Sequence, residues 1–327
     1  MIASSTGARN LVALAGSLAG GTARAEELAA MMLGVPELEE ADGGRSNLND
    51  DGCPLQLSLS ATASGCRYRL IADPAFLVPD ARERLTRARE IAASVFVRGG
   101  AAELLPACDS AIDELLLDPG ADLDGFDGGA IWLGAGVNEA GCAMYVLGGP
   151  EDNAAWWSRA AAWLAKTLPD PETALRDLER LRRHRFAWVS VEGQSIADAR
   201  AKLYWRLGGE LREEEPDVPL LGELSLRSFA HAMLDGRDVS PRGVVFSAGY
   251  RLGSGAAHDV KIDVCGHCAA RPPDEWSRLV AVCADAFGID DAPLQAALAT
   301  PGMSVSFLGL GRTTGGEHRL NLYLNRN

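Results

Sequence analysis

The residues of this chain that could take part in chemistry are cations, carboxylates and tyrosines that occupy every second position of short segments. Arg200, Lys202 and Tyr204 alternate with apolar residues in RAKLYWRL, and Asp259 and Lys261 do so in HDVKIDVC. Alternation at this period places side chains on one face of a β-strand. Several cations on adjacent strands repel one another unless an anion lies among them. Such a face suits a polyanion, for example a diphosphate.

The complete polar face that alternation predicts combines cations with aromatic and acidic side chains. Its basic members are Arg67, Arg69, Arg200, Lys202, Arg206, Arg251, Lys261 and Arg319. Its aromatic members are Trp132, Tyr145, Phe186, Trp188, Tyr204 and Tyr323, and its acidic members are Glu192, Asp259 and Asp263. Aromatic faces attract a carbocation as they attract an ammonium group. A diphosphate site beside aromatic rings therefore suits the ionisation of an allylic diphosphate.

Five hairpin-like segments carry these residues, beginning near residues 54, 128, 185, 242 and 303. Ten antiparallel strands are enough to close a barrel with room inside for ligands. In an ordinary antiparallel sheet the polar face meets water. Here apolar helical patterns separate the hairpins and need a surface to cover. This favours the second arrangement, in which helices surround the barrel and the polar faces line its lumen.

The predicted fold class is α+β, with a ten-stranded antiparallel β-barrel built from five αββα repeats and ringed by helices. Residues 1–53 predict a helix and a polar segment before the barrel, and residues 1–327 are interpreted as a single domain because no low-complexity linker divides them. Further helical patterns cover about 79–97, 103–117, 152–167, 171–183, 194–199, 222–234, 273–287 and 291–299. Asp80 and Asp152 stand at expected helix starts.

The composition excludes several classes of partner. Hydrophobic residues make up 47% and charged residues 23% of the chain, as in globular proteins. A net charge of −14 argues against a nucleic-acid partner and against adhesion to anionic membranes. No run of eighteen apolar residues is present, so no membrane span is expected. The odd number of cysteines, seven, favours a reducing compartment, and we expect a cytoplasmic protein.

Cys265 and Cys268 form a single C-G-H-C motif. It could be half of a zinc site, a redox pair, or two small residues at the end of a strand. The sequence contains no second C-x-x-C, which favours the last interpretation. The histidines show no ligand spacing, so no metal-binding residue is predicted; they are His184, His231, His258, His267 and His318.

The αββα repeat resembles the barrel of the aromatic prenyltransferases, which include fungal indole enzymes and cyanobactin peptide prenyltransferases. The resemblance runs from about residue 50 to the end of the chain. PLQLSLS is similar to the family's first strand, and CRYRL is similar to the second, whose arginine contacts the diphosphate. This implies a diphosphate-binding role for Arg67. Arg200, Lys202 and Tyr204 match the R-x-K-x-Y diphosphate motif of the sixth strand, a weak pattern alone that gains specificity from its position in the third hairpin.

The resemblance also implies roles for residues on the other strands. Tyr145 and Tyr323 match cation-shielding tyrosines, and Trp132 and Trp188 are expected beside them or beside the acceptor. Lys261 and Arg319 are expected to contribute further contacts to the diphosphate.

Two positions depart from the family pattern. Gln56 replaces a glutamate of the first strand, and an amide cannot act as a base. Glu192 and Asp263 are therefore catalytic candidates together with Gln56, and Asp259 is a further candidate base. Ala143 replaces a lysine of the fourth strand, and Lys261 or Arg319 could compensate for it.

The implied activity is transfer of a dimethylallyl or geranyl group from its diphosphate to an electron-rich aromatic acceptor. The acceptor would be a small molecule or a Trp or Tyr side chain of a peptide, as in peptide modification in secondary metabolism. Members of the family differ in their use of Mg²⁺, which leaves this ion open as a cofactor. The competing hypothesis, favoured by Gln56 and Ala143, is a non-catalytic barrel that binds a polyanionic or peptide ligand.

Overall fold

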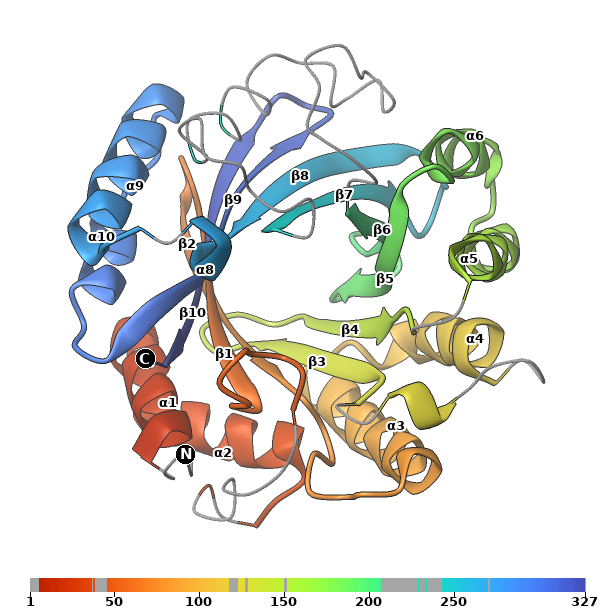
Figure 1. Cartoon of the computed structure of the whole chain (residues 1–327), viewed down its shortest axis with the longest axis horizontal. Helices are drawn as coiled ribbons and strands as arrows, with labels where there is room; N and C mark the ends of the chain where they lie inside the picture. Colours follow the sequence, from red (N-terminus) through yellow and green to blue (C-terminus); the bar gives the residue numbers. More distant parts are fainter. Residues whose placement is uncertain are drawn as a thin grey trace.

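The chain forms a closed antiparallel barrel, seen down its axis in Figure 1. The computed structural model describes residues 6–36, 38, 46–117, 123–126, 129–149, 152–206, 229, 233, 243–269 and 271–326. Around the barrel the strands follow the order β1-β10-β9-β8-β7-β6-β5-β4-β3-β2, so each strand pairs with its neighbours in sequence. They are β1 (Leu55–Thr62), β2 (Gly65–Ala72), β3 (Ile131–Gly136), β4 (Cys142–Leu147), β5 (Arg185–Gly193), β6 (Arg200–Arg206), β7 (Val244–Arg251), β8 (Ala257–Cys265), β9 (Met303–Thr313) and β10 (His318–Arg326).

Helices surround the barrel, as predicted (Figure 1). The longer ones are α1 (Thr6–Ala19), α2 (Thr22–Leu33), α3 (Ala81–Arg98), α4 (Leu105–Leu116), α5 (Asn153–Thr167), α6 (Glu172–Leu181), α9 (Pro273–Phe287) and α10 (Ala292–Leu298). The short ones are η2 (Ala102–Leu104), η3 (Leu123–Gly125) and α8 (Gly266–Ala269). Asp80 and Asp152 cap α3 and α5 by accepting hydrogen bonds from backbone N–H groups of the first turn.

The apolar faces of the strands point outward to the helices. This confirms the prediction that the polar faces line the lumen. Leu55, Leu57 and Leu59 of β1 are fully buried in one core with Leu11 and Val12 of α1. Burial of one such side chain stabilises the fold by about 1.5–3 kcal/mol relative to exposure. Because successive side chains of a strand alternate, the polar positions between these leucines must face the lumen.

Two local predictions differ from the structure, and a third falls almost wholly outside the described residues. The N-terminal segment forms two helices, because Gly20, with a φ of 74°, and Gly21 break the chain between α1 and α2. Residues 194–199 form a turn and not a helix, since Asp198 accepts hydrogen bonds from the backbone N–H groups of Gln194 and Ser195. The predicted helix at 222–234 lies, apart from residues 229 and 233, outside the described residues.

Phe186 was expected in the lumen; it lines the edge of the aromatic chamber, but its ring packs on the helix side. A bulge between Phe186 and Trp188 shifts the register of β5 against β6. The ring of Phe186 stacks on Trp156 and meets Trp157 edge-on, both from α5. Beyond the bulge the alternation continues with Trp188 in the lumen, so one extra residue changed the face of a single aromatic side chain.

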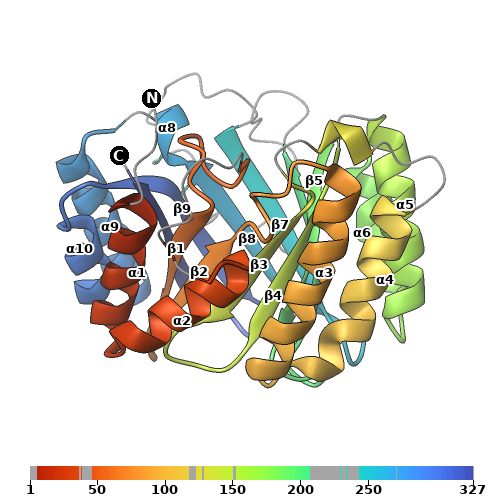
Figure 2. The same ribbon diagram turned by 90° about the horizontal axis from the view of Figure 1, so that it is seen from below.

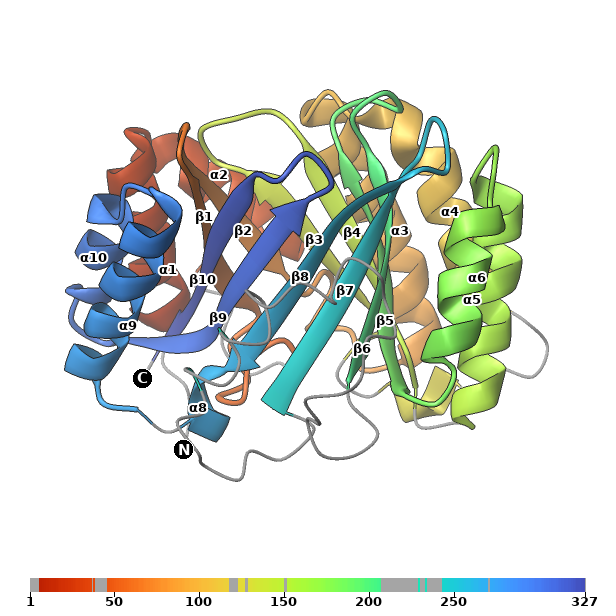
Figure 3. The ribbon, with the colours of Figure 1, turned by 90° about the horizontal axis from the view of Figure 1, so that it is seen from above.

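The two ends of the barrel differ in what surrounds them (Figures 2 and 3). The hairpin turns gather at one end, and α8 lies at the opposite end. In the part of the chain that the structure describes, no helix combines the length and apolar character needed to cross a membrane.

Candidate functional site

The lumen contains two chambers that share part of their lining. The first, which we call the cationic chamber, lies toward the hairpin turns and has a volume of about 250 Å³. The second, the aromatic chamber, lies toward α8 and has a volume of about 450 Å³. Tyr145, Tyr204, Lys261 and Tyr323 line both chambers and form the boundary between them, which we call the tyrosine waist.

Asp259 of β8 is the centre of the charge network in the cationic chamber. Its Oδ2 accepts hydrogen bonds from Arg200 at 3.1 Å and from Arg319 at 3.0 Å, and lies 3.5 Å from Nζ of Lys202. Burial alone would raise the pKa of Asp259, but these cations hold it well below its usual range. The carboxylate therefore stays charged and holds three cations from two other strands in one place.

Glu192 of β5 holds the other side of the same network. Its Oε2 lies 3.3 Å from Arg200 and 3.8 Å from Arg69, and its Oε1 accepts hydrogen bonds from Tyr204 at 2.7 Å and Ser190 at 2.8 Å. Burial opposes ionisation, yet the neighbouring cations lower the pKa of Glu192 far below its usual value. Both carboxylate oxygens are engaged with protein groups.

Lys202 is the most deeply buried cation of this chamber, with 1% of its surface exposed. Burial lowers the pKa of Lys202 to about 8, against the opposing effect of Asp259 and Glu192. The ammonium group is thus near the point of losing its proton at neutral to mildly alkaline pH. An arriving anion would favour the charged form.

Arg67 and Arg69 are two residues apart on β2 but differ in depth. The side chain of Arg67 is 72% exposed at the rim and pairs with Glu139 at 3.2 Å. Arg69 reaches inward across Gly134, where an added Cβ would lie 3.0 Å from Cδ of Arg69 and 3.3 Å from Cβ of Ala143. The small residues at 134 and 143 therefore leave the room that the Arg69 side chain uses.

The tyrosine waist already holds ammonium groups near aromatic rings. Nζ of Lys261 donates a hydrogen bond to the hydroxyl of Tyr323 at 2.7 Å and lies 5.0 Å from the centre of that ring. Nζ of Lys202 lies 5.4 Å from the centre of the Tyr204 ring. Burial raises the pKa of Tyr145, Tyr204 and Tyr323, which keeps their hydroxyls protonated. Neutral rings in this position can stabilise a carbocation as well as an ammonium group.

The aromatic chamber continues from the waist through a series of ring contacts. Trp188 stacks on Tyr204 with ring centres 5.0 Å apart, and Trp132 packs against Trp188 at 5.8 Å. Phe307 meets Tyr323 edge-on at 6.1 Å. These rings bound a space that suits a planar ring, and polar side chains also line the chamber.

The hydrogen-bond network fixes how Gln56 lies in the aromatic chamber. Asn49 donates its amide N–H groups to the backbone carbonyls of Cys53 and Leu55, both at 2.8 Å, so Asn49 Oδ1 must be an acceptor. Gln56 therefore donates to Asn49 at 3.1 Å and to Ser306 at 2.9 Å through Nε2. This leaves Oε1 of Gln56 as its hydrogen-bond acceptor.

Asp263 of β8 brings a carboxylate into the aromatic chamber. Its Oδ2 pairs with Nζ of Lys261 at 2.5 Å, while its buried Oδ1 has no hydrogen-bond partner among the described residues. Gly309 of the facing strand makes this position possible, because a Cβ there would lie 1.9 Å from Oδ1. An unpaired buried carboxylate oxygen is costly and can accept a proton.

Every predicted site residue lines one of the two chambers. The cationic chamber is lined by Arg67, Glu192, Arg200, Lys202 and Arg319. The waist consists of Tyr145, Tyr204, Lys261 and Tyr323. The aromatic chamber is lined by Gln56, Trp132, Trp188 and Asp263. The sequence did not predict how deeply Arg69 lies in the lumen or that Asp259 is at the centre of the charge network. Alternation placed both on the lumen face, but their depth depends on the strand register.

The two buried carboxylates of the cationic network, Glu192 and Asp259, do not form a suitable protein site for Mg²⁺. This ion prefers carboxylate and water oxygens, whereas Glu192 and Asp259 contact arginine and lysine. The residues present thus fit charge compensation of a diphosphate by protein cations.

The sequence matches no family model and no curated protein, but solved structures resemble it closely in shape. The prenyltransferase PriB, in a ternary complex with L-tryptophan and dimethylallyl thiolodiphosphate, covers 97% of this chain and 94% of its own at 17% identity, with a TM-score of 0.74. The 5-dimethylallyl tryptophan synthase of Streptomyces coelicolor covers 97% and 93% at 16% identity, with a TM-score of 0.70. AnaPT of Neosartorya fischeri covers 86% and 80% at 13% identity, with a TM-score of 0.63.

The chain has the fold of these prenyltransferases. The predicted αββα barrel is thereby confirmed over nearly its whole length. At these sequence identities the similarity shows a shared fold. The chemistry of this chain depends on the residues of its two chambers.

Proposed function

We propose that this chain transfers a dimethylallyl group from dimethylallyl diphosphate to an indole ring. The observation that carries the proposal is the position of the tyrosine waist between a cationic chamber and an aromatic chamber. A donor spanning the waist would place its diphosphate among cations and its allyl group among rings. The complexes of PriB and of the S. coelicolor synthase, with a dimethylallyl diphosphate analogue and tryptophan, support this class of substrates.

The leaving diphosphate binds the cations of the cationic chamber in this mechanism. Arg69, Arg200, Lys202 and Arg319 converge there, held in position by Asp259 and Glu192. As the carbon–oxygen bond breaks, negative charge grows on the diphosphate, and preorganised cations stabilise it. Arg69, lying over Ala143, supplies the positive charge that the family pattern places on the fourth strand.

The allyl cation forms beside the tyrosine waist. The faces of Tyr145, Tyr204 and Tyr323 stabilise it and keep water away, so that it reacts with the acceptor ring and not with solvent. A bond forms between the allyl carbon and a ring carbon. The ring then regains aromaticity by losing a proton.

Asp263 is the proposed proton acceptor. Asp263 lines the chamber that would hold the acceptor, and its buried Oδ1 has no hydrogen-bond partner among the described residues, whereas both oxygens of Glu192 are engaged in the other chamber. Glu192 therefore positions cations. Oε1 of Gln56 accepts a hydrogen bond from the indole N–H and orients the ring, a role for which an amide suffices.

The acceptor is a tryptophan side chain, free or in a peptide, and the protein acts in the cytoplasm. None of the seven cysteines forms a disulfide bond, which supports a reducing compartment.

The test is to incubate the purified protein with dimethylallyl or geranyl diphosphate and with tryptophan or tryptophan-containing peptides. We expect release of diphosphate together with a gain of one dimethylallyl unit on the acceptor. Tight diphosphate binding without turnover for any donor and acceptor would overturn the proposal and favour the non-catalytic barrel.

A further inference from the structure

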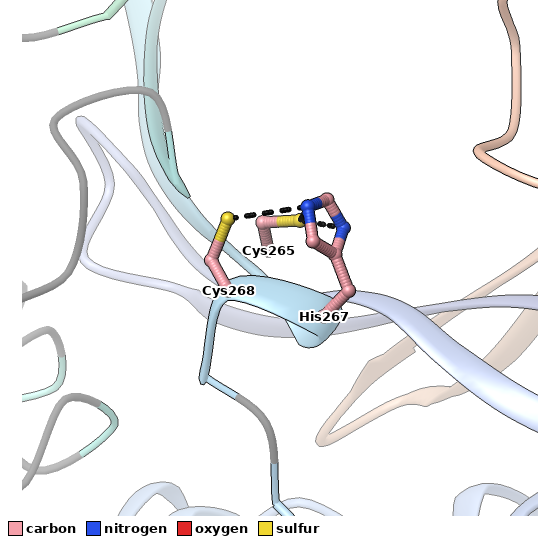
Figure 4. A group of neighbouring side chains, drawn as sticks. All are labelled: Cys265, His267 and Cys268. Atoms are coloured by element: carbon pink, nitrogen blue, oxygen red, sulfur yellow. Dashed lines mark hydrogen bonds between the residues drawn. The ribbon is translucent and has the colours of Figure 1, made fainter.

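A cluster of three potential metal ligands lies at the α8 end of the barrel, shown in Figure 4. Cys265 ends β8, and His267 and Cys268 lie on α8. Their ligand atoms are all within 4.8 Å of one another, and among the described residues this is the one group of three or more histidine, cysteine or acidic residues that close. Sequence spacing alone did not suggest that His267 joins the two cysteines.

The backbone between the cysteines is held by a close contact with β9. A Cβ on Gly266 would lie 1.8 Å from the carbonyl oxygen of Val305, so this position requires glycine. The contact fixes the turn at which the chain leaves β8 and returns Cys268 toward Cys265. The cluster is thus placed by the barrel and does not depend on a free loop.

The distances match those around a tetrahedral zinc ion. Two ligands at the usual Zn–S and Zn–N distances lie about 3.6 Å apart. Nε2 of His267 lies 3.4 Å from Sγ of Cys268 and 4.0 Å from Sγ of Cys265, whose nearer imidazole nitrogen is Nδ1 at 3.0 Å. A small rotation of these side chains would place all three atoms around one ion.

Asp50 occupies the position of an outer partner of the histidine. Its Oδ2 lies 2.6 Å from Nδ1 of His267, which also lies 3.0 Å from Sγ of Cys265, so the imidazole must rotate before Nε2 faces both thiolates. A carboxylate on one imidazole nitrogen fixes the other nitrogen as the metal ligand and raises its basicity. Two thiolates and an imidazole are borderline-soft donors that select zinc over magnesium or calcium.

We propose that Cys265, His267 and Cys268 bind one Zn²⁺ ion, with Asp50 orienting His267. Cys265 is buried while Cys268 is partly and His267 largely exposed, so an ion can enter from solvent. All four residues line the aromatic chamber. The ion links the segment containing Asp50 to the end of β8 and thereby stabilises this end of the barrel.

The experiment uses the reduced, chelator-treated protein and titrates it with Co²⁺ as a spectroscopic probe and then with Zn²⁺ against a chromophoric chelator. We expect one ion per chain, the visible absorption of tetrahedral Co²⁺ with a thiolate charge-transfer band, and a Zn²⁺-dependent rise in Tm. C268S and H267Q should abolish the spectrum. D50N should keep it with about tenfold to hundredfold weaker binding.

C283S is the matched control, because Cys283 on α9 is a partly buried thiol outside the cluster and should leave binding unchanged. Circular dichroism shows whether each variant is folded. Absence of the Co²⁺ spectrum in the reduced wild type would overturn the proposal, as would equal binding by folded C268S. These readouts do not depend on prenyl transfer, so they stand or fall separately from the proposed function.

Discussion

The cationic and aromatic chambers are lined by the same strands but perform opposite physical tasks. Along β6, Arg200 and Lys202 line the cationic chamber, Tyr204 the waist and Arg206 the aromatic chamber. Positions two apart share a face and lie about 7 Å apart along the strand. Alternation therefore selects lumen-facing residues, and distance along the strand selects the chamber. Under the proposed function, β6 contributes in turn to leaving-group binding, cation shielding and acceptor binding.

The largest expected effect is at Lys202. In K202A we expect kcat/KM for the diphosphate donor to fall about a hundredfold, because a buried charge is removed and Asp259 loses a partner. Steady-state kinetics with varied donor measures this. R67A is the matched control: since Arg67 is an exposed rim residue, its loss should cost less than about threefold. Equal losses in the two variants would remove the distinction between chamber and rim.

A smaller effect is expected in the other chamber, at Asp263. D263N preserves shape but cannot accept a proton, so kcat should fall about tenfold to hundredfold while KM for the donor does not rise. The E192Q variant sharpens the contrast, because Glu192 positions the cations and its loss should raise the donor KM. An unchanged kcat in D263N would contradict the assignment of the proton acceptor.

The cationic chamber should also respond to pH through Lys202. Its pKa is about 8, and only the protonated form attracts the donor. As pH rises above 8 the charge is lost, so kcat/KM for the donor should fall about tenfold per pH unit. In K202R the guanidinium stays charged, and this decrease should disappear. A wild-type profile that stays flat to pH 10 would show that Lys202 does not titrate in this range.

The smallest effect concerns the waist. Y145L removes a ring that shields the allyl cation, so water should capture more of it, and the ratio of dimethylallyl alcohol to prenylated acceptor should rise severalfold. Product analysis by chromatography measures the ratio. Y145F keeps the ring and should resemble the wild type; a large rise in alcohol in Y145F would mean that the hydroxyl is the important group.

Period-two alternation was enough to predict the barrel and the lumen-facing side chains, because each strand has one apolar and one polar face. It failed at Phe186, where a bulge between β5 residues turned the ring toward the helices. The helical pattern at 194–199 failed for another reason, because Asp198 stabilises a turn there. Alternation could not rank Arg67 below Arg69, because depth in the lumen depends on strand register and on the space left by Gly134 and Ala143. The position of His267 beside the cysteines depends in the same way on a contact between Gly266 of α8 and Val305 of β9.

The most direct test of the two-chamber mechanism is a crystal structure of the protein with dimethylallyl thiolodiphosphate and tryptophan. The account predicts the diphosphate among Arg69, Arg200, Lys202 and Arg319, the allyl group at the tyrosine waist, and the indole ring in the aromatic chamber with its N–H toward Gln56. A diphosphate in the aromatic chamber, or an indole ring outside the lumen, would contradict it.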